Sequence, residues 1–342
     1  MRAAIVGCGA IAQVHAKSIL ELGHELVALA DINADHLIQF SEKFGGRTYS
    51  SLEEMLENEN VEIVHICTPH DLHVPMAIYA LEHGVHVIME KPPVITGDQL
   101  DQLRQAVARE NEKEEPKKLG VCLQNRYNPS VAAARKLLAT DECGKLIAAR
   151  GYVTWHRGAE YYSQDNWHGT LAHEGGGVLI NQTIHTLDLV HSFVGQTPVN
   201  VDAVIANHRL KTEIEVEDTV SALINYPDTS VSFYATNDYV VSNSPLIELN
   251  CEKMDLRVEG DAFYCRPKGG FWQHVEVNTL QTLGKSYWGG GHLLCIKDFY
   301  ESIQEDRHFQ LEFSDVEETT RLMLMIYASG RQHRTVGWEE KL

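Results

Sequence analysis

The stretch that decides the fold stands at the start of the chain, residues 1–12, MRAAIVGCGAIA. Its apolar run ends at Gly7, a second glycine follows at Gly9, and an apolar pattern with helical spacing begins near Ala12. The spacing G-x-G-x-x-A between a strand and a helix is typical of the turn that binds the diphosphate of a dinucleotide. The stretch therefore predicts a βα unit of the dinucleotide-binding kind.

Each residue of this turn has its own physical task. Gly7 permits the tight turn, Gly9 lets the backbone approach a diphosphate, and Ala12 lets the helix pack closely on the strand. Ala10 and Ile11 open the helix, where free N–H groups and the helix dipole favour an anion. A glycine turn that joins strand to helix without binding a ligand is the alternative interpretation.

An acidic residue beyond the turn favours the dinucleotide. A second apolar run, LVALA at residues 26–30, is followed directly by Asp31. In dinucleotide-binding folds a carboxylate about 20 residues after the glycines holds the ribose hydroxyls. The same carboxylate repels a 2′-phosphate. We therefore expect NAD rather than NADP as the cofactor.

Length and charge bound the class of protein. The chain has 342 residues, and single cores stop growing near ~250–300 residues, so two domains are expected. The formal net charge of −19 argues against a nucleic acid or an anionic membrane as partner, because both require a basic surface. The expected partner is a small molecule.

The cysteines and the apolar runs bear on location. Seven cysteines occur without a CxxC pair, and several stand inside apolar runs. We interpret them as reduced core thiols, neither disulfides nor zinc ligands, and expect no metal site. No apolar run reaches the ~18 residues of a membrane span, and the first strand leaves no room for a signal peptide. These features predict a cytoplasmic protein.

Two kinds of pattern divide the chain. Over residues 1–123, short apolar runs alternate with helical patterns, which predicts a doubly wound parallel sheet of the Rossmann type. Over residues 124–342, a helix near 182–195 is followed by runs with period-2 alternation and two closing helices. This second pattern predicts an α+β domain with a large, mostly antiparallel, open sheet. We expect the first domain to bind NAD and the second to bind substrate and to mediate oligomerisation.

Polar residues follow two strands of the predicted parallel sheet. Thr68 and Pro69 follow one strand, and Glu90 and Lys91 end another, so all four should line the cofactor cleft. A lysine beside a nicotinamide can donate to a substrate oxygen or lower the pKa of a substrate hydroxyl. A surface lysine paired with Glu90 is the alternative. His73 opens the next helix, and a cofactor contact and a packing role are equally supported for it.

A triple glycine, residues 175–177, precedes a predicted helix that carries Asn181, His185 and Asp188. Asn181 and His185 are four residues apart and would share one helix face, with Asp188 placed to orient the imidazole ring. A histidine has a pKa suited to taking a hydroxyl proton at neutral pH. A buried structural histidine is the alternative, and the presence of Lys91 favours catalysis.

An aromatic loop spans residues 155–168, WHRGAEYYSQDNWH. Sugar rings stack on aromatic faces and bond polar groups with their hydroxyls, and an arginine can hold a carboxylate or phosphate. A structural or subunit-interface loop is equally supported. The predicted substrate residues in this loop are Trp155, Arg157, Tyr161 and Trp167.

Taken together, these motifs resemble the glucose–fructose oxidoreductase / inositol dehydrogenase / rhizopine-catabolism (Gfo/Idh/MocA) family. The resemblance covers essentially the whole chain, and the order and spacing of the motifs make it specific. The matching segments are Gly7–Ala12, TPHDLH at 68–73, Glu90-Lys91-Pro92, QNRYNP at 124–129, EGGGVLINQTIHTLDLVH at 174–191, VEDT at 216–219 and GGGHLLCIKDFYESI at 289–303.

The resemblance implies an enzyme that oxidises or reduces sugars, sugar acids or cyclic polyols with NAD(H) or NADP(H), as a homo-dimer or homo-tetramer. It implies that Lys91 and His185 are catalytic, and it places Arg126 and His292 near the site. The family position of Asn181 is commonly Asp, and an amide cannot accept a proton at neutral pH. Lys91 and Asn181 would therefore hold the reacting hydroxyl while His185 removes its proton and hydride passes to the nicotinamide.

Two other functions remain as alternatives from the sequence. Some members of the family are glycosidases that use a tightly bound NAD transiently and show no net cofactor turnover. Others are sensors of NAD or a metabolite without catalysis. The presence of both Lys91 and His185 disfavours the sensor, because a sensor has no need of proton transfer.

Overall fold

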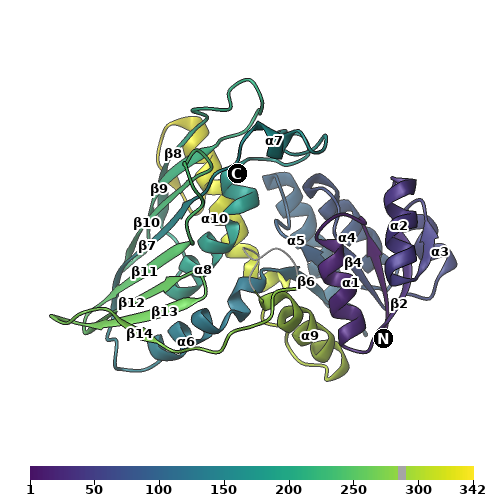
Figure 1. The fold of residues 1–342 in the computed structure, drawn as a ribbon, viewed down its shortest axis with the longest axis horizontal. Helices are drawn as coiled ribbons and strands as arrows, with labels where there is room; N and C mark the ends of the chain where they lie inside the picture. Colours follow the sequence, from purple (N-terminus) through teal and green to yellow (C-terminus); the bar gives the residue numbers. More distant parts are fainter. Residues whose placement is uncertain (284–289) are drawn as a thin grey trace. The chain divides into compact units, whose positions relative to one another are not determined.

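The computed structural model describes residues 1–283 and 290–342, and these form two compact units (Figure 1). A central sheet of its own characterises each unit. The first unit contains residues 1–94, 98–124 and 281–317, as far as they are described. The second unit contains residues 95–97, 125–280 and 318–342.

The first unit is built on a six-stranded sheet with the order β3-β2-β1-β4-β5-β6, in which every pair is parallel. Its inner strands are almost fully buried, as expected of a sheet covered on both faces. The predicted doubly wound sheet is thereby confirmed. The strands are β1 (Arg2–Val6), β2 (Glu25–Ala30), β3 (Arg47–Tyr49), β4 (Ile63–Ile66), β5 (His86–Glu90) and β6 (Leu119–Cys122).

Helices connect these strands, and local capping explains where two of them begin. The Asn33 side chain accepts the N–H groups of Asp35 and His36 at the start of α2, and Ser51 accepts that of Glu54 in α3. The helices between the strands are α1 (Ala12–Glu21), α2 (Ala34–Phe44), α3 (Leu52–Asn58), the 3₁₀ turn η1 (His70–Leu72), α4 (His73–Glu82) and α5 (Gly97–Asn111).

A late segment of the chain returns to the first unit. Helix α9 (Gly291–Gln304) packs on α1 and β6, and Phe299 and Phe309 press against Gly120 so closely that a Cβ at Gly120 would lie 2.8–2.9 Å from their rings. The domain boundary expected after residue 123 assigns α9 to the second domain. Its contacts with Gly120 and α1, which are far away in sequence, instead make it part of the first unit. The expected motif at 289–303 begins one residue outside the described chain, at Gly289.

The second unit is built on a nine-stranded sheet with the order β14-β13-β12-β11-β7-β10-β9-β8-β15. Its pairs are antiparallel except β7 with β10, so the predicted, mostly antiparallel sheet is confirmed. The strands are β7 (Leu146–Thr154), β8 (Asn200–Ala206), β9 (Thr219–Asn225), β10 (Ser230–Thr236), β11 (Leu246–Cys251), β12 (Met254–Glu259), β13 (Ala262–Pro267), β14 (Gln273–Val275) and β15 (Val336–Gly337).

Helices cover one face of this sheet, where α8 packs on β7 and α6 on β12 and β13 (Figure 1). Among residues 1–283 and 290–342, no helix covers the opposite face, and alternate residues such as Val204 and Leu223 are exposed there. The helices are η2 (Gln124–Tyr127), α6 (Pro129–Leu138), α7 (Ala159–Tyr162), the π-helix η3 (Val178–Gln182), α8 (Ile184–Val194) and α10 (Phe313–Gln332), which starts in the first unit.

Two further observations concern the whole described chain. No helix in residues 1–283 or 290–342 has the length and apolar character needed to cross a bilayer. All seven cysteines lie in these ranges as free thiols, as expected, and six of them are buried.

Candidate active site

Only glycine can occupy the first position of the turn that follows β1. Gly7 has φ +86°, and a Cβ there would lie 2.7 Å from the Cys67 carbonyl. At Gly9, by contrast, a Cβ would meet no described atom within 4 Å, so the backbone is open to a ligand. Helix α1 begins without a side-chain cap at Ile11. Its first N–H groups are therefore suited to the oxygens of a diphosphate.

Asp31 lies directly against this turn. One carboxylate oxygen accepts the Cys8 N–H at 2.6 Å, and the other accepts the Asn33 N–H at 2.7 Å. Two backbone donors therefore hold a negative charge beside the glycines, and the side chain remains partly exposed. The turn and the carboxylate fit the diphosphate and the ribose of a dinucleotide.

The other predicted cofactor residues lie at the same edge of the sheet. Strands β1, β4 and β5 are neighbours, so Gly7, Thr68 and Lys91 all follow carboxyl ends of adjacent parallel strands. Thr68 and Pro69 are partly exposed, and the Thr68 hydroxyl lies 3.7 Å from the Met76 sulfur. This edge is where open parallel sheets bind their ligands.

His73 has a structural position. Its ring is fully buried, with Nδ1 2.7 Å from the Pro92 carbonyl oxygen and Nε2 3.0 Å from that of Thr68. Burial lowers the pKa of His73, and the two carbonyl oxygens oppose that shift. These contacts tie the start of α4 to the segment after Lys91 and favour the packing role over direct contact with a cofactor.

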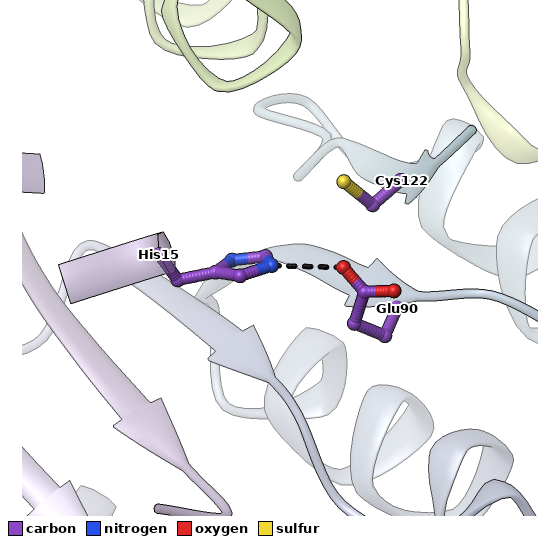
Figure 2. Close-up of side chains that lie close together, drawn as sticks. All are labelled: His15, Glu90 and Cys122. Atoms are coloured by element: carbon purple, nitrogen blue, oxygen red, sulfur yellow. Dashed lines mark hydrogen bonds and ion pairs between the residues drawn. The ribbon is translucent and has the colours of Figure 1, made fainter. Parts of the chain in front are cut away.

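A buried polar network includes Glu90, the residue directly before Lys91 in sequence, and Figure 2 shows its contact with His15. His15 Nε2 is 2.9 Å from a Glu90 carboxylate oxygen, His15 Nδ1 is 2.7 Å from His65 Nδ1, and His65 Nε2 is 2.8 Å from the Tyr300 hydroxyl. Burial alone raises the pKa of Glu90, but the hydrogen bond and charge of His15 outweigh it and leave that pKa below its usual value. Burial lowers the pKa of His65. We therefore interpret His15 and Glu90 as an ion pair, with neutral His65 accepting from His15.

Cys122 completes a close trio with His15 and Glu90, whose ligand atoms lie within 4.8 Å of one another (Figure 2). A hydrogen bond with Cys295 and burial hold the pKa of Cys122 well above its usual value, so the thiol is protonated. Both ring nitrogens of His15 already contact protein partners, His65 and Glu90, so we interpret the trio as a hydrogen-bonded cluster. His292, a predicted substrate residue, is 3% exposed beside His15, and burial lowers its pKa to about 4.

In the second unit, the expectation of one continuous helix for Asn181 and His185 is wrong. Asn181 lies in the π-helix η3, the backbone leaves helical geometry at Thr183, and His185 lies in the first turn of α8. Wider π turns are often found at functional sites. The two side chains therefore do not share a face of one regular helix, although both are partly exposed.

Packing explains the triple glycine before η3. A Cβ would lie 2.4 Å from Ile95 at Gly175, 2.0 Å from the Tyr327 hydroxyl at Gly176 and 2.0 Å from the Glu217 carbonyl oxygen at Gly177. The buried Glu217 carboxylate accepts the N–H groups of Gly177 and Leu179 and the Tyr327 hydroxyl. The start of η3 is thus held by a carboxylate from the VEDT segment.

Arg126 and Asp188 form a buried ion pair. Arg126 Nε and Nη2 donate to the two Asp188 oxygens at 2.8 and 2.6 Å, and the Thr319 hydroxyl donates to Asp188 at 2.9 Å. Burial alone raises the pKa of Asp188, but the guanidinium charge and hydrogen bonds hold it below its usual value. The structure thus places Asp188 against Arg126 and Thr319, where we had expected it to orient His185. A substrate contact for Arg126 stays a prediction.

The predicted residues of the aromatic loop contact one another or their neighbours in the loop, and Tyr161 lies beside Asn181. The Arg157 guanidinium lies 4.9 Å from the Trp155 ring and 5.3 Å from the Tyr161 ring. Tyr161 contacts the His168 ring edge-on at 5.1 Å, and Trp167 stacks on His168 at 3.7 Å. The Asn181 amide nitrogen lies 3.5 Å from the Tyr161 hydroxyl.

Several buried polar residues of the two sites were not predicted. They include His15 and His65 in the first unit and Glu174, Gln182 and Glu217 in the second. The sequence carries one usable signal for Glu174, an acidic residue directly before three glycines and an apolar run. His15 falls on the apolar face of a short helix, where nothing in its spacing separates a polar network from ordinary packing.

Comparison with known proteins adds the family. A family model described as an oxidoreductase family with an NAD-binding Rossmann fold matches residues 1–115, and the model of the GFO/IDH/MocA C-terminal domain matches residues 131–257. Together they cover most of the chain. The chain belongs to the Gfo/Idh/MocA family. It is an oxidoreductase whose first unit is an NAD-binding Rossmann domain, which confirms the expected family, fold class and cofactor.

Individual relatives are more distant. The chain is 29% identical to trans-1,2-dihydrobenzene-1,2-diol dehydrogenase of Mus musculus, over 66% of this chain and 65% of that protein. It is 27% identical to levoglucosan dehydrogenase of Pseudarthrobacter phenanthrenivorans, over 84% of this chain and 83% of that protein. The WlbA dehydrogenase of Bordetella pertussis, solved with NADH and UDP-GlcNAcA, has a TM-score of 0.85 at 26% identity, covering 98% of both chains.

Proposed function

We propose that the Gfo/Idh/MocA protein oxidises a CH–OH group of a sugar, a sugar derivative or a cyclic polyol and passes the hydride to NAD. The observation that carries the proposal is the placement of Lys91 at the same edge of the sheet as the open Gly9 turn and the fixed Asp31 carboxylate. The names of the relatives, which are dehydrogenases of diols and sugars, support this substrate class.

The cofactor roles follow from the first unit. The N–H groups from Gly9 to Ile11 would hold the diphosphate, and Asp31 would hold the ribose hydroxyls. Thr68 and Pro69 would line the nicotinamide side, with Glu90 supporting this edge through His15. Bound NAD supplies the hydride acceptor.

The proton chemistry is assigned to three side chains. Lys91 would donate to the oxygen of the reacting hydroxyl and favour its deprotonation through positive charge. His185 would accept the hydroxyl proton, and Asn181 would bind the hydroxyl without taking the proton. Trp155, Arg157, Tyr161 and Trp167 would form the surface on which the rest of a ring-shaped substrate rests.

The second unit would also mediate assembly into a homo-dimer or homo-tetramer. The open face of its sheet carries side chains typical of subunit interfaces. Arg150 pairs there with Glu248, Tyr152 contacts Tyr234 edge-on, and Arg257 lies 4.4 Å from the Trp272 ring. The free thiols fit a reducing compartment, so we propose a cytoplasmic location.

The test is a turnover assay with NAD and with NADP, read from the absorbance of reduced nicotinamide. The substrate panel contains levoglucosan, myo-inositol, methyl glucosides and UDP-GlcNAcA. NAD-dependent turnover of one of these supports the proposal and begins to define the substrate. If calorimetry shows NAD binding but no panel compound is oxidised, the function shifts to the glycosidase with retained NAD or to the sensor. Cleavage of a glycoside without net NADH would then distinguish the glycosidase.

A further inference from the structure

We propose that Glu174 is a positioning residue, which fixes the Asn181 amide so that its oxygen accepts a hydrogen bond from the substrate hydroxyl next to the reacting one. This refines the contact assigned to Asn181 above, because the reacting hydroxyl has one hydrogen and that hydrogen passes to His185. The inference rests on the proposed function for its substrate. Its structural half, the direction of the Asn181 amide, stands on contacts within the second unit alone.

Glu174 is fully buried and both of its oxygens face N–H donors. One oxygen accepts the Gly169 N–H at 2.5 Å, and the other accepts the Asn181 side-chain N–H at 2.5 Å. An ionised carboxylate can only accept hydrogen bonds. The nitrogen end of the Asn181 amide must therefore face Glu174, and Oδ1 lies at the opposite end of the planar amide.

Gly169, whose N–H group holds the Glu174 carboxylate, lies in a rigid segment. Gly169 has φ +77°, and a Cβ there would lie 2.6 Å from Ile214. Ile214 belongs to a buried apolar cluster with Tyr162, Leu210 and Val216, against which Tyr161 packs. The carboxylate thus cannot turn with Asn181, so it can impose one direction on the amide.

A second network sets the direction of the neighbouring Tyr161 hydroxyl. The Asn237 amide donates to Gln182 Oε1 at 3.1 Å, which turns the Gln182 nitrogen toward the Tyr161 oxygen, also at 3.1 Å. The Tyr161 oxygen therefore accepts from Gln182. The Asn181 amide nitrogen lies 3.5 Å from the same oxygen, so Glu174 and Tyr161 both face the nitrogen end of the Asn181 amide.

The Asn181 oxygen selects by chemistry. A hydroxyl group of a sugar or cyclic polyol can donate a hydrogen bond to Asn181 Oδ1. A carboxylate or an isolated ketone has no hydrogen to donate and would face the Asn181 oxygen unfavourably. The geometry thus favours polyols over keto acids at this point.

The test uses Glu174→Gln in the full-length protein. The Gln carbonyl can still accept from Gly169, which leaves its NH₂ group facing Asn181. The Asn181 amide must then reverse and present its nitrogen to the substrate. We expect KM for the best polyol of the panel to rise about tenfold, as for one lost neutral hydrogen bond, with a smaller change in kcat and unchanged NAD affinity.

Rescue separates positioning from general damage. In the double variant Glu174→Gln, Asn181→Asp, the Asp accepts from the Gln amide and presents its second oxygen to the hydroxyl. We expect KM to return to within about threefold of the wild type, as compensation restores the hydrogen bond. The matched control is Glu215→Gln, an exposed residue that accepts the Leu171 N–H, and its KM should not change.

NMR spectroscopy tests the direction of the Asn181 amide without requiring turnover. NMR spectra of protein labelled with ¹⁵N-asparagine should show the Asn181 side-chain amide, assigned by its loss in Asn181→Leu. A hydrogen bond to a carboxylate shifts this signal strongly, and Glu174→Gln should remove that shift. If Glu174→Gln does not fold, Asn181→Leu carries the kinetic test with the same expected rise in KM.

The outcomes are distinct. An unchanged Asn181 signal in Glu174→Gln, or a double variant no better than the single one, overturns the proposal. If the wild type turns over no polyol, the proposed function fails, and the NMR result alone decides whether Glu174 orients Asn181.

Discussion

The two candidate sites are built in opposite ways. In the first unit, a ligand would meet mainly backbone: the Gly9 turn, the first N–H groups of α1 and an Asp31 carboxylate held by two backbone N–H groups. In the second unit, a ligand would meet side chains whose direction is set by other side chains. Asn181 depends on Glu174, and Tyr161 depends on Gln182.

The difference follows from what each site must do. The diphosphate of the cofactor does not change when the nicotinamide is reduced, and backbone N–H groups recognise a diphosphate well. A substrate that presents many hydroxyls requires donors and acceptors at defined places, which only side chains supply. We therefore expect substitutions in the first unit to act on cofactor chemistry and those in the second unit on substrate recognition and stability.

The largest expected effect is that of Lys91→Met. It removes the cation that we assign to the reacting hydroxyl, so turnover should fall by about 10³-fold, within the range known for acid–base groups. The backbone cradle for NAD remains, so the Kd for NAD from calorimetry should stay the same. Turnover close to that of the wild type would contradict the proposal that Lys91, at the carboxyl edge of the parallel sheet, takes part in the reaction.

The control for this variant is Lys43→Met, which removes an exposed lysine of α2 in the same unit. Both its turnover and its NAD affinity should equal those of the wild type. A similar fall in turnover in both variants would mean that the loss of any positive charge in this unit lowers turnover, so the result would not support a specific role of Lys91.

The next largest effect is expected in the second unit, for Arg126→Met. It leaves Asp188 buried without its cation, and breaking a buried ion pair costs about 3–5 kcal/mol of unfolding free energy. Urea unfolding measures the loss. Arg126→Lys, which keeps the charge but not the two-point contact, should lose clearly less.

The pH dependence sharpens this prediction. In the wild type, the pKa of Asp188 lies below its usual value, so its stabilisation is present above the unfolded pKa and is lost as pH falls through the folded one. Without Arg126, burial raises the pKa of Asp188, and the variant loses stability as pH rises. The difference between wild type and variant should therefore be larger at neutral pH than near pH ~4. A difference independent of pH would contradict the ion pair.

A smaller effect is expected for Asp31→Ala, the main side chain in the backbone-built site. Affinity for NAD should fall about tenfold through lost hydrogen bonds to the ribose, while affinity for NADP should change little because a repulsive charge is removed. Calorimetry with both cofactors gives the ratio of the two Kd values. A ratio equal to that of the wild type would show that Asp31 serves only to hold the turn.

How far the sequence predicts each site follows from the same contrast. The turn at Gly7–Ala12, Asp31 and the strand ends at Thr68 and Lys91 were predicted because each motif is short and its spacing is set by one βα unit. Both sheets followed from the change from continuous to alternating apolar runs. The short strand β3 was not predicted, because three residues carry no periodicity.

The second site resisted prediction for physical reasons. Glu174, Gln182 and Glu217 act through contacts over 7 to 55 residues of sequence, which only the folded chain reveals. The helix expected at 182–195 begins at Ile184 as α8, and a separate π turn precedes it, where the Glu217 carboxylate holds the N–H groups of Gly177 and Leu179. No local pattern in residues 175–185 contains that carboxylate.

The smallest expected effect tests this last contact. Tyr327→Phe removes one of three donors to Glu217 and should cost about 1 kcal/mol of unfolding free energy, since two backbone N–H groups remain. Burial raises the pKa of Glu217, and the hydrogen bonds oppose that rise, so the variant should raise it further. A raised carboxyl pKa lowers stability as pH rises through it, so the loss should be full at neutral pH and shrink in acid. Tyr239→Phe, on an exposed ring, is the control and should not change stability. A loss for Tyr327→Phe that is equal at all pH values would mean that the Tyr327 hydroxyl contributes through its packing against Gly176 and not through its hydrogen bond to Glu217.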